Sequence, residues 1–92
     1  MSSQETQGRW DAIYGEHRSV GQPDSFVTTS EFLPSPPATA VDLAGGTGAT
    51  ALWLAANEFQ VSLVEISEVA IRVAEAEAVR RGLQLSTVHH DL

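Results

Sequence analysis

The sequence predicts an α/β fold built on a parallel sheet, and three features of residues 38–92 carry that prediction. Short apolar runs that suit buried strands alternate with longer segments of helical periodicity, the connections are short, and a glycine cluster joins the first run to the first helical segment. This alternation gives parallel strands with right-handed helical crossovers. The order strand–helix–strand–helix–strand makes one half of a doubly wound, Rossmann-like sheet. Residues 1–37 form a tail and a helical lead-in.

The beginning of the lead-in has little periodicity. Residues 1–8 are polar and predict a disordered tail. Trp10, Ile13 and Tyr14 follow at helical spacing, which predicts a short amphipathic turn.

A second short helix is expected before the sheet. Asp24 or Ser25 can cap a helix through residues 26–33, which must end before Pro34. The prolines of "PSPPA" then form a stiff connector to the first strand.

The first strand and helix surround the glycines. The segment "TAVDLA" predicts a buried strand over residues 39–44, and a helix is expected over residues 49–57, ending at Asn57. The inward face of that helix should contain Ala51, Leu52 and Ala55.

The second strand and helix carry clear end signals. "QVSLVE" predicts a strand with Val61 and Leu63 on one face, Ser67 caps the following helix, and Gly82 ends it. The solvated face of that helix should carry the i,i+4 pairs Glu68–Arg72 and Glu77–Arg81, and its inward face Val69, Val73 and Ala76. "LQLSTVHHDL" predicts the third strand.

The glycine loop predicts a ligand at the carboxyl end of the first strand. Gly45, Gly46 and Gly48 let the backbone turn tightly and let a ligand lie against it, while the next helix points its N–H groups there. A phosphate-binding P-loop is excluded, because that motif needs a lysine and all five basic residues are arginine. A dinucleotide fingerprint is a weak alternative: Gly46, Gly48 and Ala51 match it, but the charge of Asp42 would face a pyrophosphate.

Acidic residues close all three predicted strands on the same edge of the sheet. Asp42 lies in the first strand, Glu65 ends the second and Asp91 ends the third. S-adenosylmethionine suits these acids, since it carries an ammonium, two ribose hydroxyls and an adenine amino group. Asp42 can orient the loop or bind the ammonium, Glu65 can accept hydrogen bonds from the ribose, and Asp91 from the adenine.

These segments resemble the class I S-adenosylmethionine-dependent methyltransferases. "VDLAGGTG" resembles their first motif, hhDhGxGxG, and "VSLVEIS" and "VHHDL" resemble the ends of their second and third strands. "WDAIYG" is similar to the lead-in of small-molecule types, such as the tellurite-resistance and thiopurine enzymes. The resemblance implies S-adenosylmethionine as cofactor and a small-molecule methyl acceptor.

Carried over by position, the resemblance assigns a cofactor site but no catalytic residue. Ala44 replaces the first glycine of the motif, which is tolerable where its φ stays negative. Tyr14, with Trp10, would close over the cofactor. The implied cofactor-binding residues are Tyr14, Asp42, Ala44, Gly45, Gly46, Gly48, Glu65, Ile66, Asp91 and Leu92.

The chain is shorter than the family's domain, which continues through about four more strands. Residues 38–92 are therefore expected to be the cofactor-binding half of a domain, from a fragment or a truncated gene product. Its first strand would be an open edge, through which chains could associate. A nicotinamide-binding domain and a non-catalytic half-domain stay as alternative functions.

Composition limits the classes of partner that the chain is expected to bind. The net charge of −7 gives no electrostatic footprint for nucleic acid or anionic lipid. Cysteine is absent, and His90 would point away from His89 and Asp91 on a strand, so no metal site is predicted. The polar N-terminal segment and the lack of a long apolar run predict a cytoplasmic protein without membrane contact.

Overall fold

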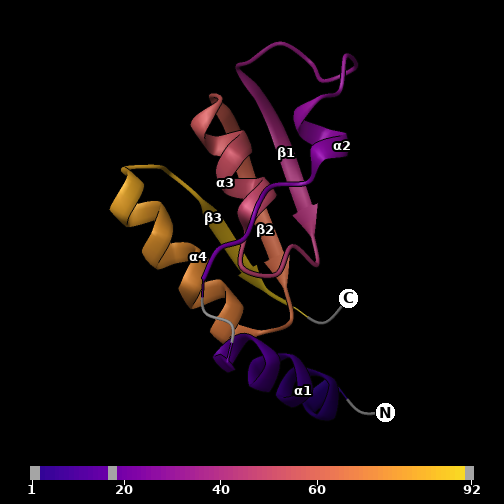
Figure 1. Cartoon of the computed structure of the whole chain (residues 1–92), viewed down its shortest axis with the longest axis vertical. Helices are drawn as coiled ribbons and strands as arrows, with labels where there is room; N and C mark the ends of the chain where they lie inside the picture. Colours follow the sequence, from indigo (N-terminus) through magenta and orange to yellow (C-terminus); the bar gives the residue numbers. More distant parts are fainter. Residues whose placement is uncertain (1–2, 17–18, 91–92) are drawn as a thin grey trace.

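The computed structural model describes residues 3–16 and 19–90, and its centre is a three-stranded parallel sheet (Figure 1). The strands are β1 (Ala38–Leu43), β2 (Phe59–Glu65) and β3 (Ser86–His89), in the order β1-β2-β3. The predicted α/β fold and parallel topology are confirmed. Within the described residues β1 pairs with β2 alone, so its outer edge is open; association through that edge stays a prediction.

Two helices make the crossovers and cover one face of the sheet. Helix α3 (Ala49–Ala56) links β1 to β2, and α4 (Glu68–Arg81) links β2 to β3. Alternate residues of β2 are buried against both helices, as the strand periodicity predicts. The core cluster consists of Ala51, Leu54, Phe59, Val61, Leu63 and Ala74.

The inward faces of the two helices differ in part from the prediction. In α3, Ala51 and Leu52 are buried as predicted, but Leu54 completes the face while Ala55 is only half-buried. In α4 the buried residues are Ala70, Ile71, Ala74 and Ala78.

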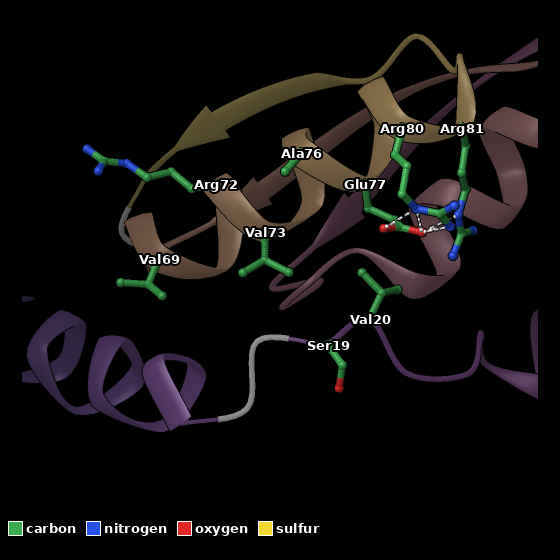
Figure 2. Close-up of a pocket in the computed structure, with 9 residues that line it drawn as sticks. All are labelled: Ser19, Val20, Val69, Arg72, Val73, Ala76, Glu77, Arg80 and Arg81. Atoms are coloured by element: carbon green, nitrogen blue, oxygen red, sulfur yellow. Dashed lines mark hydrogen bonds and ion pairs between the residues drawn. The ribbon is translucent and has the colours of Figure 1, made fainter.

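The predicted inward residues of α4 lie on a neighbouring stripe. Val69, Val73 and Ala76 line a groove opposite Ser19 and Val20 (Figure 2). The apolar side chains of α4 form two adjacent stripes, and periodicity cannot say which one meets the sheet. The stripe of mostly alanine side chains does so, because small residues let a helix approach the strands closely.

The lead-in is more helical at its start than predicted. Helix α1 (Ser3–Glu16) includes most of the segment expected to be a disordered tail. Its polar sequence is a weak helix former alone, but α1 packs against α4, and such tertiary packing supplies most of the stability of short helices. Of the helices in the described ranges, none is long and apolar enough to cross a bilayer.

Helix α2 (Ser25–Thr28) begins as predicted and ends early. Asp24 caps it by accepting from the backbone N–H of Phe26 at 2.9 Å. The hydroxyls of Thr28 and Thr29 both donate to the carbonyl of Ser25, at 3.4 and 2.7 Å. Side-chain bonds of this kind compete with helix continuation, so the expected extension to residue 33 was wrong.

The end signals of α4 are confirmed. Ser67 accepts from the N–H of Ala70 at 3.2 Å, and Gly82 has φ 69°, the left-handed conformation of a glycine C-cap. The predicted ion pairs Glu68–Arg72 and Glu77–Arg81 are present, at 2.8 and 2.7 Å. Both pairs lie at the surface, where solvent screens the charges, so they contribute little to the stability of the chain.

Replacing Leu63 by alanine should strongly destabilise the chain. This side chain projects from β2 and is fully buried against the glycine loop and the crossover helices. We expect a loss of about 2–5 kcal/mol in the free energy of unfolding, measured by urea denaturation. Leu43→Ala is the matched control, because Leu43 is 62% exposed on the opposite face of the same sheet. Equal losses in the two variants would contradict this placement of the core.

Candidate functional site

The loop after β1 turns the chain directly from strand to helix. The N–H of Ala44 still donates to Val64 across the sheet, at 2.7 Å, and Gly48 is already the N-cap of α3. Gly46 and Gly48 have φ of 59° and 84°, which only glycine adopts without strain. The first N–H groups of α3 therefore face this loop, an arrangement that favours negative or electron-rich ligand groups.

The three glycines are also packed closely by their neighbours. A Cβ added to Gly48 would lie 3.0 Å from the Cβ of Ala74, so this glycine lets α3 approach α4. A Cβ on Gly46 would lie 2.7 Å from the hydroxyl oxygen of Tyr14. A Cβ on Gly45 would overlap the side chains of Leu63 and Asp42. Gly48 thus serves helix packing, while Gly46 faces the lead-in.

Ala44 departs from the expectation of a negative φ. Its φ is 55°, so a residue with a Cβ occupies the left-handed region that the motif's glycine would occupy freely. This strain costs of the order of 1 kcal/mol. It lies at the first residue of the loop after β1.

A shallow cavity of about 360 Å³, widely open to solvent, lies over the loop. Its size is within the range of about 300–1,000 Å³ typical of small-molecule sites. Four of the predicted residues line it: Tyr14, Ala44, Gly45 and Gly46. The lead-in supplies Gly21, Gln22 and Asp24, and α3 supplies Ala49 and Thr50.

Tyr14 covers the loop from the lead-in side. Its ring stacks on Trp10, with centroids 5.8 Å apart and an interplanar angle of 24°. Burial, and next the negative charge of Glu65, raise the pKa of the Tyr14 phenol above its ordinary value. The hydroxyl is therefore protonated at neutral pH and can donate a hydrogen bond into the site.

Asp42 lies beneath the loop, against Gly45. Its Oδ2 atom is buried and has no hydrogen-bond partner among the described residues. Burial raises the pKa of this carboxyl, the backbone N–H of Ala51 lowers it, and the charge of Glu65 raises it again, with a net upward shift. A buried carboxylate oxygen without a partner is costly, and a cationic ligand group would relieve that cost.

Glu65 connects the loop to the start of α4. Its side chain is 3% exposed, its Oε1 accepts from the N–H of Gly46 at 3.1 Å, and its Oε2 accepts from the N–H of Ser67 at 2.5 Å. A carboxylate has about four acceptor positions, and these two bonds use two of them.

The other predicted site residues contribute less to this geometry. Ile66 is half-buried, and its carbonyl accepts from Nε2 of His89 at 2.7 Å. Gly48 and Ile66 do not line the cavity, and neither do Asp42 and Glu65, which lie beneath the loop. Asp91 and Leu92 lie outside the described residues, so their proposed contacts with adenine stay predictions.

Sequence reasoning missed the contact that fastens the lead-in to α3. The N–H of Asp24 donates to the hydroxyl of Thr50 at 2.9 Å, which brings Gly21 and Gln22 to the cavity wall. Asp24 was recognisable as a helix cap, but no local signal pairs it with a residue this distant in the chain.

A second cavity, of about 680 Å³, shares no residue with the loop cavity. It lies between α4 and residues 19–20, where Arg80 and Arg81 already pair with Glu77 (Figure 2). The loop cavity is the better functional candidate, because the buried Oδ2 of Asp42 beside it has no hydrogen-bond partner in the described part of the chain.

The chain matches no family model, and no curated protein matches its sequence. Solved structures do match. A chain solved in a study of the conversion of a disulfide bond into a thioacetal group during echinomycin biosynthesis superposes with a TM-score of 0.81 at 27% identity, covering 92% of this chain and 40% of that one. TehB from Haemophilus influenzae gives 0.67 at 20% identity, with coverages of 88% and 28%.

A SAM-dependent methyltransferase from Aquifex aeolicus gives a TM-score of 0.62 at 16% identity, covering 99% of this chain and 48% of that one. The chain thus has a fold found in S-adenosylmethionine-dependent methyltransferases, as the sequence motifs predict, and it spans less than half the length of these structures.

Replacing Ala44 by glycine should stabilise the chain, because it removes the left-handed strain at φ 55°. The gain should be about 0.5–1 kcal/mol in the free energy of unfolding, after the entropy cost of glycine. Ala76→Gly, at an exposed position within α4, should lose about 1 kcal/mol. Urea denaturation measures both, and a loss at Ala44 would contradict the strained geometry.

Asp42→Asn should stabilise the ligand-free chain at neutral pH, because the pKa of Asp42 is raised in the folded state. Ionised Asp42 opposes folding above its folded pKa, and this cost disappears as the pH falls toward its ordinary value of 3.8. The difference in unfolding free energy between the two proteins should therefore shrink on acidification. A difference that grows instead would show that Asp42 has a stabilising partner.

Proposed function

We propose that this chain is the cofactor-binding part of an S-adenosylmethionine-dependent methyltransferase that acts on a small molecule. The observation that carries the proposal is the buried Oδ2 of Asp42 beneath the glycine loop, which has no hydrogen-bond partner among residues 3–16 and 19–90 and lies beside a cavity of suitable size. The fold shared with S-adenosylmethionine-dependent methyltransferases supports it independently.

The residues of the site fit the groups of this cofactor. Asp42 would hold the ammonium, with the loop residues Ala44, Gly45 and Gly46 around the methionine part. Glu65 would accept from the ribose hydroxyls, and Ile66 would pack on the adenine. Tyr14 would cover the bound molecule from the lead-in side.

A dinucleotide fits the same site less well. Burial, and to a smaller extent the charge of Glu65, raise the pKa of Asp42, and the charges of these two acids would repel a pyrophosphate at the loop. The chain has no lysine to offset them. Glu65 could bind the ribose of either ligand. The preference of the site for S-adenosylmethionine over a dinucleotide therefore depends on Asp42.

The chemistry assigned to this part is binding and orientation. S-adenosylmethionine supplies a methyl group already activated by a positively charged sulfur. Alignment of that group with the acceptor, and exclusion of water, are then the main tasks of the protein. The groups that bind the acceptor are expected in parts of a longer protein, since this chain spans less than half of its structural matches.

Calorimetric titration of the purified chain with S-adenosylhomocysteine, and separately with NAD, tests the proposal. We expect saturable binding of S-adenosylhomocysteine and none of NAD. Glu65→Gln should weaken binding by about 10–100-fold, because it removes the charge from hydrogen bonds to the ribose. Glu68→Gln makes the same change at an exposed position and should leave affinity unchanged.

Binding of NAD alone would identify a nicotinamide-binding domain. Binding of neither ligand would favour the non-catalytic half-domain. Equal losses in Glu65→Gln and Glu68→Gln would place the cofactor elsewhere.

A further inference from the structure

Asp11 of α1 is bonded to the N-terminus of α4. Its Oδ1 accepts from the hydroxyl of Ser67 at 2.5 Å and from the N–H of Val69 at 3.3 Å. Its Oδ2 accepts from the side-chain amide of Gln7 at 3.3 Å, one turn earlier in α1. Asp11 therefore caps a helix to which it does not belong, at the end where a negative charge is stabilised.

Ser67 links this contact to the candidate site. Its hydroxyl bonds to Asp11, while its backbone N–H donates to Oε2 of Glu65 at 2.5 Å. The other oxygen of Glu65 accepts from Gly46 at 3.1 Å. A continuous series of hydrogen bonds thus runs from α1, through the start of α4 and the end of β2, to the glycine loop.

The same helix carries the tyrosine that covers the loop. Tyr14 lies less than one turn beyond Asp11, and its hydroxyl occupies the space that a Cβ on Gly46 would need. Trp10 stacks on Tyr14 from the preceding turn. Helix geometry fixes the spacing of Asp11 and Tyr14 along α1, so the bond at Asp11 constrains where the Tyr14 ring can lie.

We propose that Asp11 is a positioning residue for the cofactor site: by capping α4 it holds α1 so that Tyr14 covers Gly46, and through Ser67 it orients the carboxylate of Glu65. The effect on cofactor binding rests on the proposed function. The effect on Tyr14 does not, and it can be measured without any ligand.

Tyr14 is the only tyrosine of the chain, so its ionisation can be followed by ultraviolet absorbance at alkaline pH. Burial and the neighbouring charge of Glu65 raise its pKa in the folded protein. Detaching α1 would remove both causes. The pKa of Tyr14 therefore reports the position of α1. If Asp11 contributed only to general stability, its removal would leave this pKa unchanged in the folded protein.

The experiment compares Asp11→Ala, Asp11→Asn and Glu16→Gln. Asp11→Ala removes the acceptor, and we expect the pKa of Tyr14 to fall toward its ordinary value. Asp11→Asn keeps an oxygen for Ser67 and Val69 and should retain the raised pKa. Glu16→Gln removes a charge from an exposed position of α1 and is the matched control. An unchanged Tyr14 pKa in Asp11→Ala would overturn the proposal.

A second measurement addresses the cofactor. S-adenosylhomocysteine affinity should fall about tenfold in Asp11→Ala, the equivalent of one or two lost hydrogen bonds, and by much less in Asp11→Asn. If the wild-type chain binds and Asp11→Ala binds equally well, the role of Asp11 in the cofactor site is refuted. If the wild-type chain does not bind, the proposed function fails while the tyrosine titration still decides the placement of α1.

Ser67→Ala provides a second variant that breaks the same bond from the other side. It leaves the bond between Val69 and Asp11, so the fall in the Tyr14 pKa should be smaller than in Asp11→Ala. A larger fall than in Asp11→Ala would assign the effect to the lost cap of α4 and would overturn the role of Asp11.

Discussion

The arrangement of the site depends on one buried carboxylate. Glu65 ends the central strand, is almost fully enclosed, and accepts one backbone N–H from the glycine loop and one from the start of α4. Charge-assisted bonds of this kind are among the stronger hydrogen bonds in proteins. They link the glycine loop to the start of α4, so both crossovers begin in a defined position relative to β2.

This arrangement leaves the carboxylate of Asp42 in an unfavourable environment. The register of the sheet places Asp42 on the same face as Leu63 and Glu65, so two carboxylates lie under one short loop. The second of them has a buried oxygen without a partner in the described chain and a raised pKa. Strain of this kind is common at functional sites, where a ligand relieves it. Left-handed Ala44, in the same loop, is a second example.

Much of the fold was predictable because its signals are local. The glycine loop, the cap at Ser67 and the C-cap at Gly82 each follow from a few adjacent residues, and all three are where the sequence predicts them. The errors concern contacts between distant segments. Helix α1 was underestimated because its stability comes from α4, and the buried stripe of α4 was misassigned because the sheet selects between two apolar stripes.

The sequence by itself determined the order of strands and helices, the acids of the first two strands and the chemistry of a ligand that would suit them, because these follow from periodicity and residue type. Only the tertiary structure decided how those groups are used. It placed Tyr14 over Gly46, bonded Asp24 to Thr50, and made Asp11 a cap of the N-terminus of α4. It also left one oxygen of Asp42 without a hydrogen-bond partner among the described residues. Such contacts join residues far apart in the chain, and a pattern of neighbours carries no information about them until the chain is folded.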